Sequence, residues 1–164
     1  MREYRPQQRL VRSSIFTSIG WLTGTFHCNL KQALVDYLNL QASFFRLTDV
    51  TLPGVDAAIP FLALQKSKVI VLAPMDSETN LEKRLPGEIN QYAVTCVLQD
   101  GVLSGTLRTR PNQRLSDHLT AHNGFFVLRE CYIRGRNDAV DSIVKRISVA
   151  IVNDTAVIGI TEDR

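Results

Sequence analysis

Five arginines are the residues of this chain best suited to bind a ligand, because guanidinium groups pair with phosphate oxygens. They form two groups, one at Arg108, Arg110 and Arg114 and one at Arg134 and Arg136. If the two loops that carry them share one rim of the fold, they form a basic patch able to bind nucleic-acid phosphates. Tyr132 lies beside the second group, where an aromatic ring could stack on a base. We take these arginines as candidate nucleic-acid-binding residues, with a solvated loop surface as the alternative.

A second spacing that could do chemistry is that of His118 and His122, which are four residues apart. On a helix they would share one face with room for a metal ion, and Asp117 lies beside them. Asn123-Gly124 would end such a helix at once, however. We therefore predict no metal site here.

A nucleophilic site is equally poorly supported. His27 and Cys28 are neighbours in a segment with strand character, and neighbouring strand residues point to opposite faces. A catalytic pair needs its two side chains within mutual reach. The chain also lacks a phosphate-cradling glycine loop and a nucleophile elbow. We therefore predict no catalytic residue and no cofactor, and expect a protein that is not an enzyme.

The elements that must position all these residues are present twice. Three motifs recur at a constant spacing of 81 positions, namely GWLTGTF (20–26) as GVLSGTL (101–107), LVDYL (34–38) as LSDHL (115–119) and FFRL (44–47) as FFVL (125–128). Repetition at a fixed spacing indicates one structural unit duplicated in tandem.

The pattern within each copy predicts about five short strands. In the first copy, Ser13–Ser18 and Trp21–Phe26 are typical of a hairpin, and Ser43–Leu52 of a long third strand. Gly24 and its counterpart Gly105 lie in the middle of a strand, where glycine indicates a sharp bend or a close neighbour. Five short, strongly bent strands close most readily into a small barrel.

Short helices and tight hairpins complete each copy. The spacing of apolar residues predicts one or two helical turns over Gln32–Asn39 and again over Gln113–Thr120. Each copy then ends in a hairpin, with Gln65–Ser67 as the first turn and Asn153-Asp154 as the second. The spacing between the copies grows to about 88 before the last hairpin, which indicates an inserted loop at 136–146.

These patterns divide the chain into four parts: a basic N-terminal arm (1–12), a first repeat (13–74), an acidic linker (75–92) and a second repeat (93–164). The arm contains Arg2, Arg5, Arg9 and Arg12, and accounts for the excess in a formal net charge of +3. Such an arm either attracts phosphate or an acidic partner, or is a solvated terminus or a short first strand.

Composition places the chain among soluble globular proteins. Its apolar runs, such as Val69–Ala73, are too short to cross a bilayer, and the N-terminus lacks the apolar segment of a secretory signal. The three cysteines, Cys28, Cys96 and Cys131, are an odd number, which indicates buried, reduced thiols. We therefore expect a cytoplasmic protein that does not contact a membrane.

The succession of a hairpin with a Gly-x-x-x-Gly-x-Leu core, a long strand and a compact final hairpin resembles the Sm-like (SH3-type) barrel family. The first of these elements is Gly101–Leu107 and the last is Val149–Ile158. The layout also resembles uncharacterised bacterial proteins with Leu-Ser-Asp-x-Leu, then Phe-Phe-x-Leu, then an apolar hairpin. The resemblance covers both copies. It implies a mainly β fold of two tandem Sm-like or SH3-like five-stranded small barrels with short helical connectors.

For function, the Sm-like resemblance implies RNA binding on a ring-shaped oligomer. In that family an Asp and Asn pair after the second strand and a basic glycine-containing turn in the last hairpin contact RNA. The corresponding segments here read RTRPNQR (108–114), QKS (65–67) and ND (153–154). The RNA-contact residues of the family therefore have no counterparts in this chain.

These observations favour a non-enzymatic binding or scaffold protein. It would form a homo-oligomer through exposed strand edges and would be able to bind RNA or a protein partner. The alternative is a small-molecule-binding protein or enzyme that uses a cleft between the two repeats, where ligand sites are common. The lack of a converging set of ionisable residues favours the first hypothesis.

Overall fold

The computed structural model describes residues 7–76, 80–82, 87–121, 124–135 and 145–163. The first half contains β1 (Gln8–Thr17), β2 (Gly20–Asn29), α1 (Leu34–Leu38), β3 (Phe44–Thr51), β4 (Ile59–Gln65), the short 3-10 helix η1 (Lys66–Lys68) and β5 (Val71–Pro74). The second half contains β6 (Asn90–Leu98), β7 (Gly101–Thr109), α2 (Leu115–Ala121), β8 (Phe125–Gly135), β9 (Lys145–Asn153), η2 (Asp154–Ala156) and β10 (Val157–Glu162). The same succession of elements therefore occurs twice.

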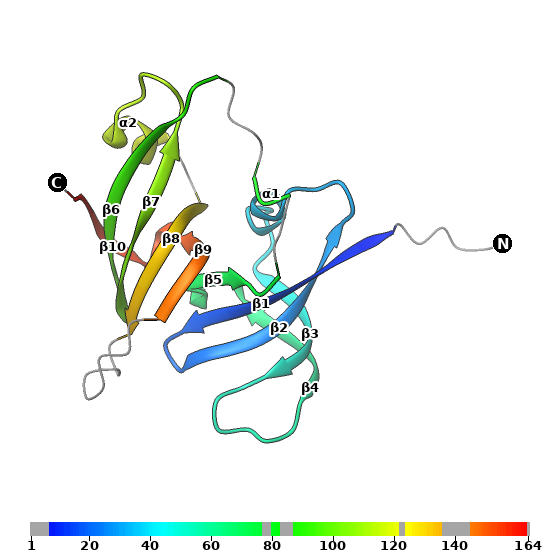
Figure 1. Cartoon of the computed structure of the whole chain (residues 1–164). Coiled ribbons are helices and arrows are strands. Elements are labelled where there is room, and N and C mark those ends of the chain that lie inside the picture. The colour runs from blue at the N-terminus through cyan, green and yellow to red at the C-terminus, as the bar shows by residue number, and fades with distance from the viewer. Residues whose placement is uncertain (1–6, 77–79, 83–86, 122–123, 136–144, 164) are drawn as a thin grey trace.

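All ten strands of the described residues belong to one antiparallel sheet. Their order is β10-β6-β7-β8-β9-β5-β1-β2-β3-β4, so the two halves join where β9 pairs with β5. Figure 1 shows this junction near the middle of the molecule, with the first half, coloured from blue at β1 to green at β5, on one side and the second half on the other. The mainly β class is confirmed. Two closed five-stranded barrels are not confirmed, because the sheet is continuous through both halves and does not close.

A bulge recurs at the same place in both halves. The register between β2 and β3 shifts after Thr23, and that between β7 and β8 shifts after Ser104. The third strand of each half has a left-handed residue there, Asp49 and Glu130, each with a φ of 50°. An extra residue at a bulge bends the strand and increases its twist. The duplication therefore extends to the irregularities of the sheet.

Gly24 and Gly105 lie opposite these bulges, where a side chain would collide with its neighbours. A β-carbon on Gly105 would lie 2.8 Å from Cys131 Sγ, and one on Gly24 would lie 3.1 Å from Leu47 Cδ1. Of the two predicted reasons for a mid-strand glycine, a sharp bend or a close neighbour, the close neighbour is present at both positions.

The tight hairpins expected at the end of each copy are wrong. β4 pairs with β3, whereas β5 pairs with β1 and β9, so β4 and β5 are not neighbours. Likewise β9 pairs with β8 and β10 pairs with β6. η1 and η2 redirect the chain at these points, and Asn153 holds η2 by accepting a hydrogen bond from the Thr155 N–H. The chain therefore changes direction at the expected turn residues, and the last strand of each half pairs with the first strand of that half.

The first hairpin and both helical segments agree with the predictions. β1 and β2 pair antiparallel up to Thr17 and Gly20; α1 lies within its predicted range, and α2 extends one residue beyond its range, to Ala121. Residues 8–12 of the expected arm belong to β1. Within it the Arg12 guanidinium donates to the Asp49 carbonyl oxygen at 2.7 Å and to Thr25 Oγ1 at 3.1 Å, so this arginine braces the first bulge. Arg2, Arg5 and the inserted residues 136–144 lie outside the described residues.

The hydrophobic core consists of two clusters, and each contains residues from both halves. The first surrounds Phe26 and Leu47 and includes Phe125 and Ile151 of the second half. The second surrounds Leu103 and includes residues of β1 and β5. The halves therefore cannot separate without exposing buried apolar surface.

The linker contributes to this core. Leu81 is buried in the first cluster, and the Leu34 and Val35 N–H groups at the start of α1 donate to the carbonyl oxygens of Asn80 and Leu81. Residues 77–79 and 83–86 of the linker lie outside the described residues. Neither α1, α2 nor any other helix in the described part of the chain has the length and apolar character that crossing a membrane requires.

Candidate functional site

Arg134 lies apart from the candidate group of Arg108, Arg110 and Arg114. Arg108 lies near the end of β7, and Arg110 and Arg114 lie in the loop that leads to α2, all with exposed side chains. Arg134 of β8 pairs with the second residue of β7, about 20 Å along that strand from Arg108 at the usual rise per residue. Arg136 lies outside the described residues. Arg134 therefore lies at the opposite end of β7 from Arg108, and nucleic-acid binding by either group stays a prediction.

Tyr132, the candidate stacking residue, is 45% exposed and already contacts a cation. Arg146 pairs with it across β8 and β9. The Arg146 Nη2 donates to the Tyr132 hydroxyl at 2.8 Å, and its guanidinium carbon lies 5.1 Å from the ring centroid. The sequence linked Tyr132 to Arg134 and missed Arg146, because the register across an insertion of unknown path cannot be counted from spacing.

The two histidines that the structure describes, His27 and His118, show no converging set of ligands. His27 Nε2 lies 2.8 Å from Thr48 Oγ1 on the outer face of the sheet, whereas Cys28 is buried in the first core cluster. The two side chains therefore point to opposite faces, as predicted. His118 lies on α2, and His122 lies outside the described residues. Within the part of the chain that the structure describes, no three His, Cys, Asp or Glu side chains are grouped as metal ligands would be.

The cysteines are free and buried, and two of them have strongly shifted pKa values. Burial raises the pKa of Cys96 to about 12, and the charge of Asp163 acts in the same direction. Burial also raises the pKa of Cys131 to about 12, partly opposed by a backbone hydrogen bond at Ala150. Since the thiolate is the reactive form of cysteine, neither thiol is suited to act as a nucleophile.

These shifts predict a loss of stability at alkaline pH. The unfolded chain releases both thiol protons near pH 9, whereas the folded chain retains them to about pH 12, so the stabilisation is complete below pH 9 and is lost as the pH rises toward 12. Each thiol should lower the free energy of unfolding by about 1.4 kcal/mol per pH unit in this window. Urea unfolding in reductant at several pH values measures the slope. In Cys131→Ala the free energy of unfolding should fall less steeply with pH. An unchanged slope would contradict a raised pKa of the Cys131 thiol.

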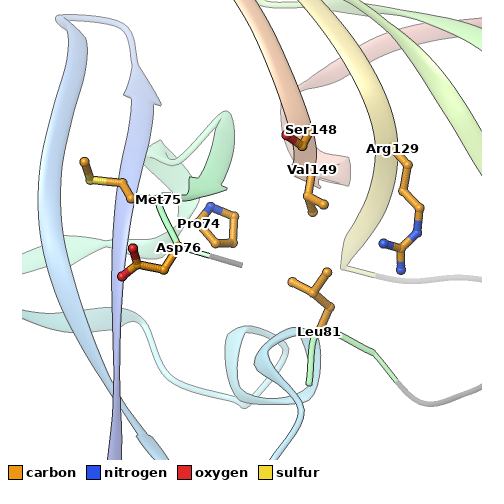
Figure 2. A pocket seen from close by; sticks show the side chains of 7 residues that line it. All are labelled: Pro74, Met75, Asp76, Leu81, Arg129, Ser148 and Val149. Carbon is orange, nitrogen blue, oxygen red and sulfur yellow. The ribbon is translucent and has the colours of Figure 1, made fainter. Parts of the chain in front are cut away.

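A cavity of about 310 Å³ opens between the two halves. Its lining comes from the end of β5, the linker, β8 and β9, and consists of Pro74, Met75, Asp76, Leu81, Arg129, Ser148 and Val149. Figure 2 shows Met75 and Asp76 on one side of the space and Arg129 on the other, with Leu81 between them at one end. The cavity is therefore formed only when the linker packs between the halves.

Arg129 is the residue of this cavity that could hold a ligand. Its Nη2 forms a 3.0 Å ion pair with Glu82 Oε1, whereas its Nε is buried and has no hydrogen-bond partner among the described residues. An N–H group of this kind, together with the Ser148 hydroxyl, suits a small carboxylate or phosphate. The opposing Asp76 carboxylate would disfavour such an anion. The hypothesis of a small-molecule site between the repeats therefore stays a prediction.

The opposite end of the junction is held by two asparagines. Asn39 Oδ1 accepts from the Phe125 N–H at 2.7 Å, and Asn39 Nδ2 donates to the Phe125 carbonyl oxygen at 3.2 Å. Asn153 Nδ2 donates to the Val69 carbonyl oxygen at 2.9 Å and to that of Lys66 at 3.3 Å. Each asparagine thus bonds across the boundary between the halves. Sequence reasoning missed Asn39 and treated Asn153 only as a turn residue.

Lys66 and Asp154, two residues of opposite charge, lie beside these asparagines. The Lys66 ammonium donates to the Leu40 carbonyl oxygen at 2.7 Å and lies 5.9 Å from the centroid of the Phe125 ring. Burial lowers the pKa of Lys66, and the negative charge of Asp154 opposes that shift. Lys66 and Asp154 come from different halves and line a second cavity of about 360 Å³.

The two outer edges of the sheet, β4 and β10, have no partner strand within the described residues. Both present large apolar side chains to solvent: Phe61 of β4 is 55% exposed and Ile158 of β10 is 70% exposed. Phe44, on the neighbouring β3, is 54% exposed. An open edge with apolar side chains is a template on which another strand can pair. We take the two edges as the candidate functional surfaces.

No protein-family model matches this chain, and neither a curated protein nor a solved structure is significantly similar to it. The Sm-like resemblance therefore stays a prediction.

Proposed function

We propose that this chain is a non-enzymatic scaffold protein, built from two copies of an Sm-like five-stranded unit, that self-assembles through the free edges of its sheet. The observation that carries the proposal is the exposure of large apolar side chains on β4 and β10. Natural sheets usually protect their edges with charge, with short or bulged strands or with a covering segment. Here β4 contains Pro60 near its start and the pairing of β10 with β6 shifts register between Val157 and Gly159, yet both edges still present large apolar side chains to solvent.

The energetics favour association over a solvated edge. Burying a large apolar side chain contributes about 1.5–3 kcal/mol relative to exposure, and three such side chains lie on or beside the edges. A second strand would also satisfy backbone N–H and C=O groups that otherwise bond to water. Together these terms can offset the loss of translational freedom on association.

An assembly would also give the exposed arginines a role. Arg108, Arg110 and Arg114 would be repeated once per copy, so that several weak contacts with a polyanion act together. Nucleic-acid binding is therefore a secondary activity that we expect to depend on assembly. A protein partner with an acidic surface would be recognised by the same chemistry.

Light scattering on the full chain tests the proposal. We expect a mass above that of the 18.4 kDa monomer, with the assembled fraction rising from low to high micromolar concentration. The association should persist in high salt, because apolar and backbone contacts drive it. A monomer at every concentration would contradict self-assembly.

A further inference from the structure

We propose that copies of this chain join head to tail, with β10 of one copy pairing antiparallel with β4 of the next in the register that β5 and β9 use inside the chain. The inference rests on the proposed self-assembly and names its partner surface, which is a second copy. Within the chain, Val71 pairs with Val152 and Leu72 with Ile151 across β5 and β9. This internal junction serves as the template.

The two free edges are the repeat counterparts of the two strands that already pair. β10 corresponds to β5, since each is the last strand of its half and pairs with the first. β4 corresponds to β9, since each pairs with the third strand of its half. In these pairings Ile160 is the counterpart of Leu72, and Ala63 is the counterpart of Ile151. The template therefore places Ile160 opposite Ala63 of the next copy.

Residues that are buried at the internal junction have exposed counterparts at the two free edges, as expected of edges that a second copy would cover. Phe125 is fully buried at the internal junction, whereas its counterpart Phe44 is 54% exposed. Ile70 is 3% exposed, whereas its counterpart Ile158 is 70% exposed. The residues exposed in one copy are thus those that the internal junction buries. Pairing with a second copy would give them the same environment.

The backbone N–H group that β4 needs for the pairing points outward. Inside the chain, the Asn153 N–H donates to the Ile70 carbonyl oxygen at 3.0 Å. The counterparts are the Gln65 N–H and the Ile158 carbonyl oxygen. The next residue, Lys66, donates its N–H inward to the Ser43 carbonyl oxygen, so the Gln65 N–H faces the open edge because successive strand N–H groups alternate in direction.

Charge is also complementary at the proposed junction. Lys66 and Asp154 occupy counterpart positions and have opposite charges across the internal junction. Between copies their places are exchanged, so that Asp154 faces Lys66 of the next copy.

Pro60, which would interrupt a ladder, precedes the segment around Ala63 that the template uses. Because different edges meet, the assembly either closes into a ring or continues as a filament.

Disulfide trapping tests the register. Ile160→Cys and Ala63→Cys chains, mixed in equal amounts and oxidised with copper phenanthroline, should form a covalent dimer on a non-reducing gel. The native cysteines are buried and should give little background. Ile59→Cys is the matched control, because it lies on the same strand about 13 Å away, too far for a disulfide with Ile160→Cys. Efficient crosslinking of either variant with itself would overturn the head-to-tail arrangement in favour of a symmetric one.

A second variant blocks the edge. Ala63→Pro removes an N–H that points away from β3, so the internal ladder should survive while assembly is lost. Ala63→Ser retains the N–H and should assemble like the unmodified chain.

If light scattering shows an assembly but Ile160→Cys and Ala63→Cys do not crosslink, the proposed register is wrong and the scaffold proposal stands. If the unmodified chain is a monomer throughout, both proposals are wrong. If Ala63→Pro does not fold, the crosslinking result decides.

Discussion

Replacing Phe125 by alanine is expected to lower the free energy of unfolding by about 3–5 kcal/mol. The Phe125 side chain is fully buried, its ring centroid lies 6.0 Å from that of Phe45, and it belongs to the cluster that joins the two halves. Its removal leaves a cavity at the junction, where two halves rather than one must relax to fill it. Urea unfolding at low protein concentration, followed by circular dichroism, measures the loss.

Phe44→Ala is the matched control for that experiment. Phe44 occupies the same position of the other half but is 54% exposed, so its loss should cost less than about 1 kcal/mol in the monomer. The same substitution should weaken self-assembly, because the proposed head-to-tail junction buries Phe44. Equal losses of monomer stability in the two variants would mean that the internal junction does not hold the halves together as described.

Replacing Gly105 by alanine should also destabilise the fold, by about 1–3 kcal/mol, through steric overlap rather than a cavity. The new β-carbon would lie 2.8 Å from Cys131 Sγ and 3.1 Å from the Arg129 carbonyl oxygen, and the backbone oxygen cannot move without disturbing the bulge. Gly159→Ala is the control, because nothing lies within 4 Å of the added carbon. Thermal unfolding of both variants measures the difference.

Combining Gly105→Ala with Cys131→Ala separates the steric overlap with Cys131 from other effects of placing alanine at position 105. Cys131→Ala removes the sulfur nearest to the new β-carbon, so Gly105→Ala should cost less in that background than in the unmodified chain. If the two effects simply add, the close contact with Cys131 is not the reason for a glycine at 105.

The duplication and most strand positions could be predicted from the sequence, because each depends on local pattern. The spacing of 81 positions, the helical turn near Leu34 and the mid-strand Gly24 are properties of short segments. Alternation, glycine and helical spacing restrict the backbone conformation of the residues that carry them. The bulge opposite Gly24 could be expected for the same reason, although its extra residue could not be identified.

The candidate surfaces could be predicted less well. Exposed strand edges were expected in general terms, but the basic patch depended on the two arginine loops sharing a rim, and Arg134 lies at the opposite end of β7 from Arg108. Asn39 was missed because its partner, the backbone of Phe125, lies 86 residues away. A hydrogen bond to a backbone group leaves no signature in the identity of the residue that provides it.

What the sequence by itself determined is where the strands lie and that they come in two equivalent sets. Only the tertiary structure decided which strands pair: β5 turns away from β4 to reach β1 and β9, which makes one open sheet and leaves β4 and β10 as its edges. The physical reason is that strand pairing uses backbone groups common to all residues, so the choice of partner depends on how the side chains of the whole chain pack.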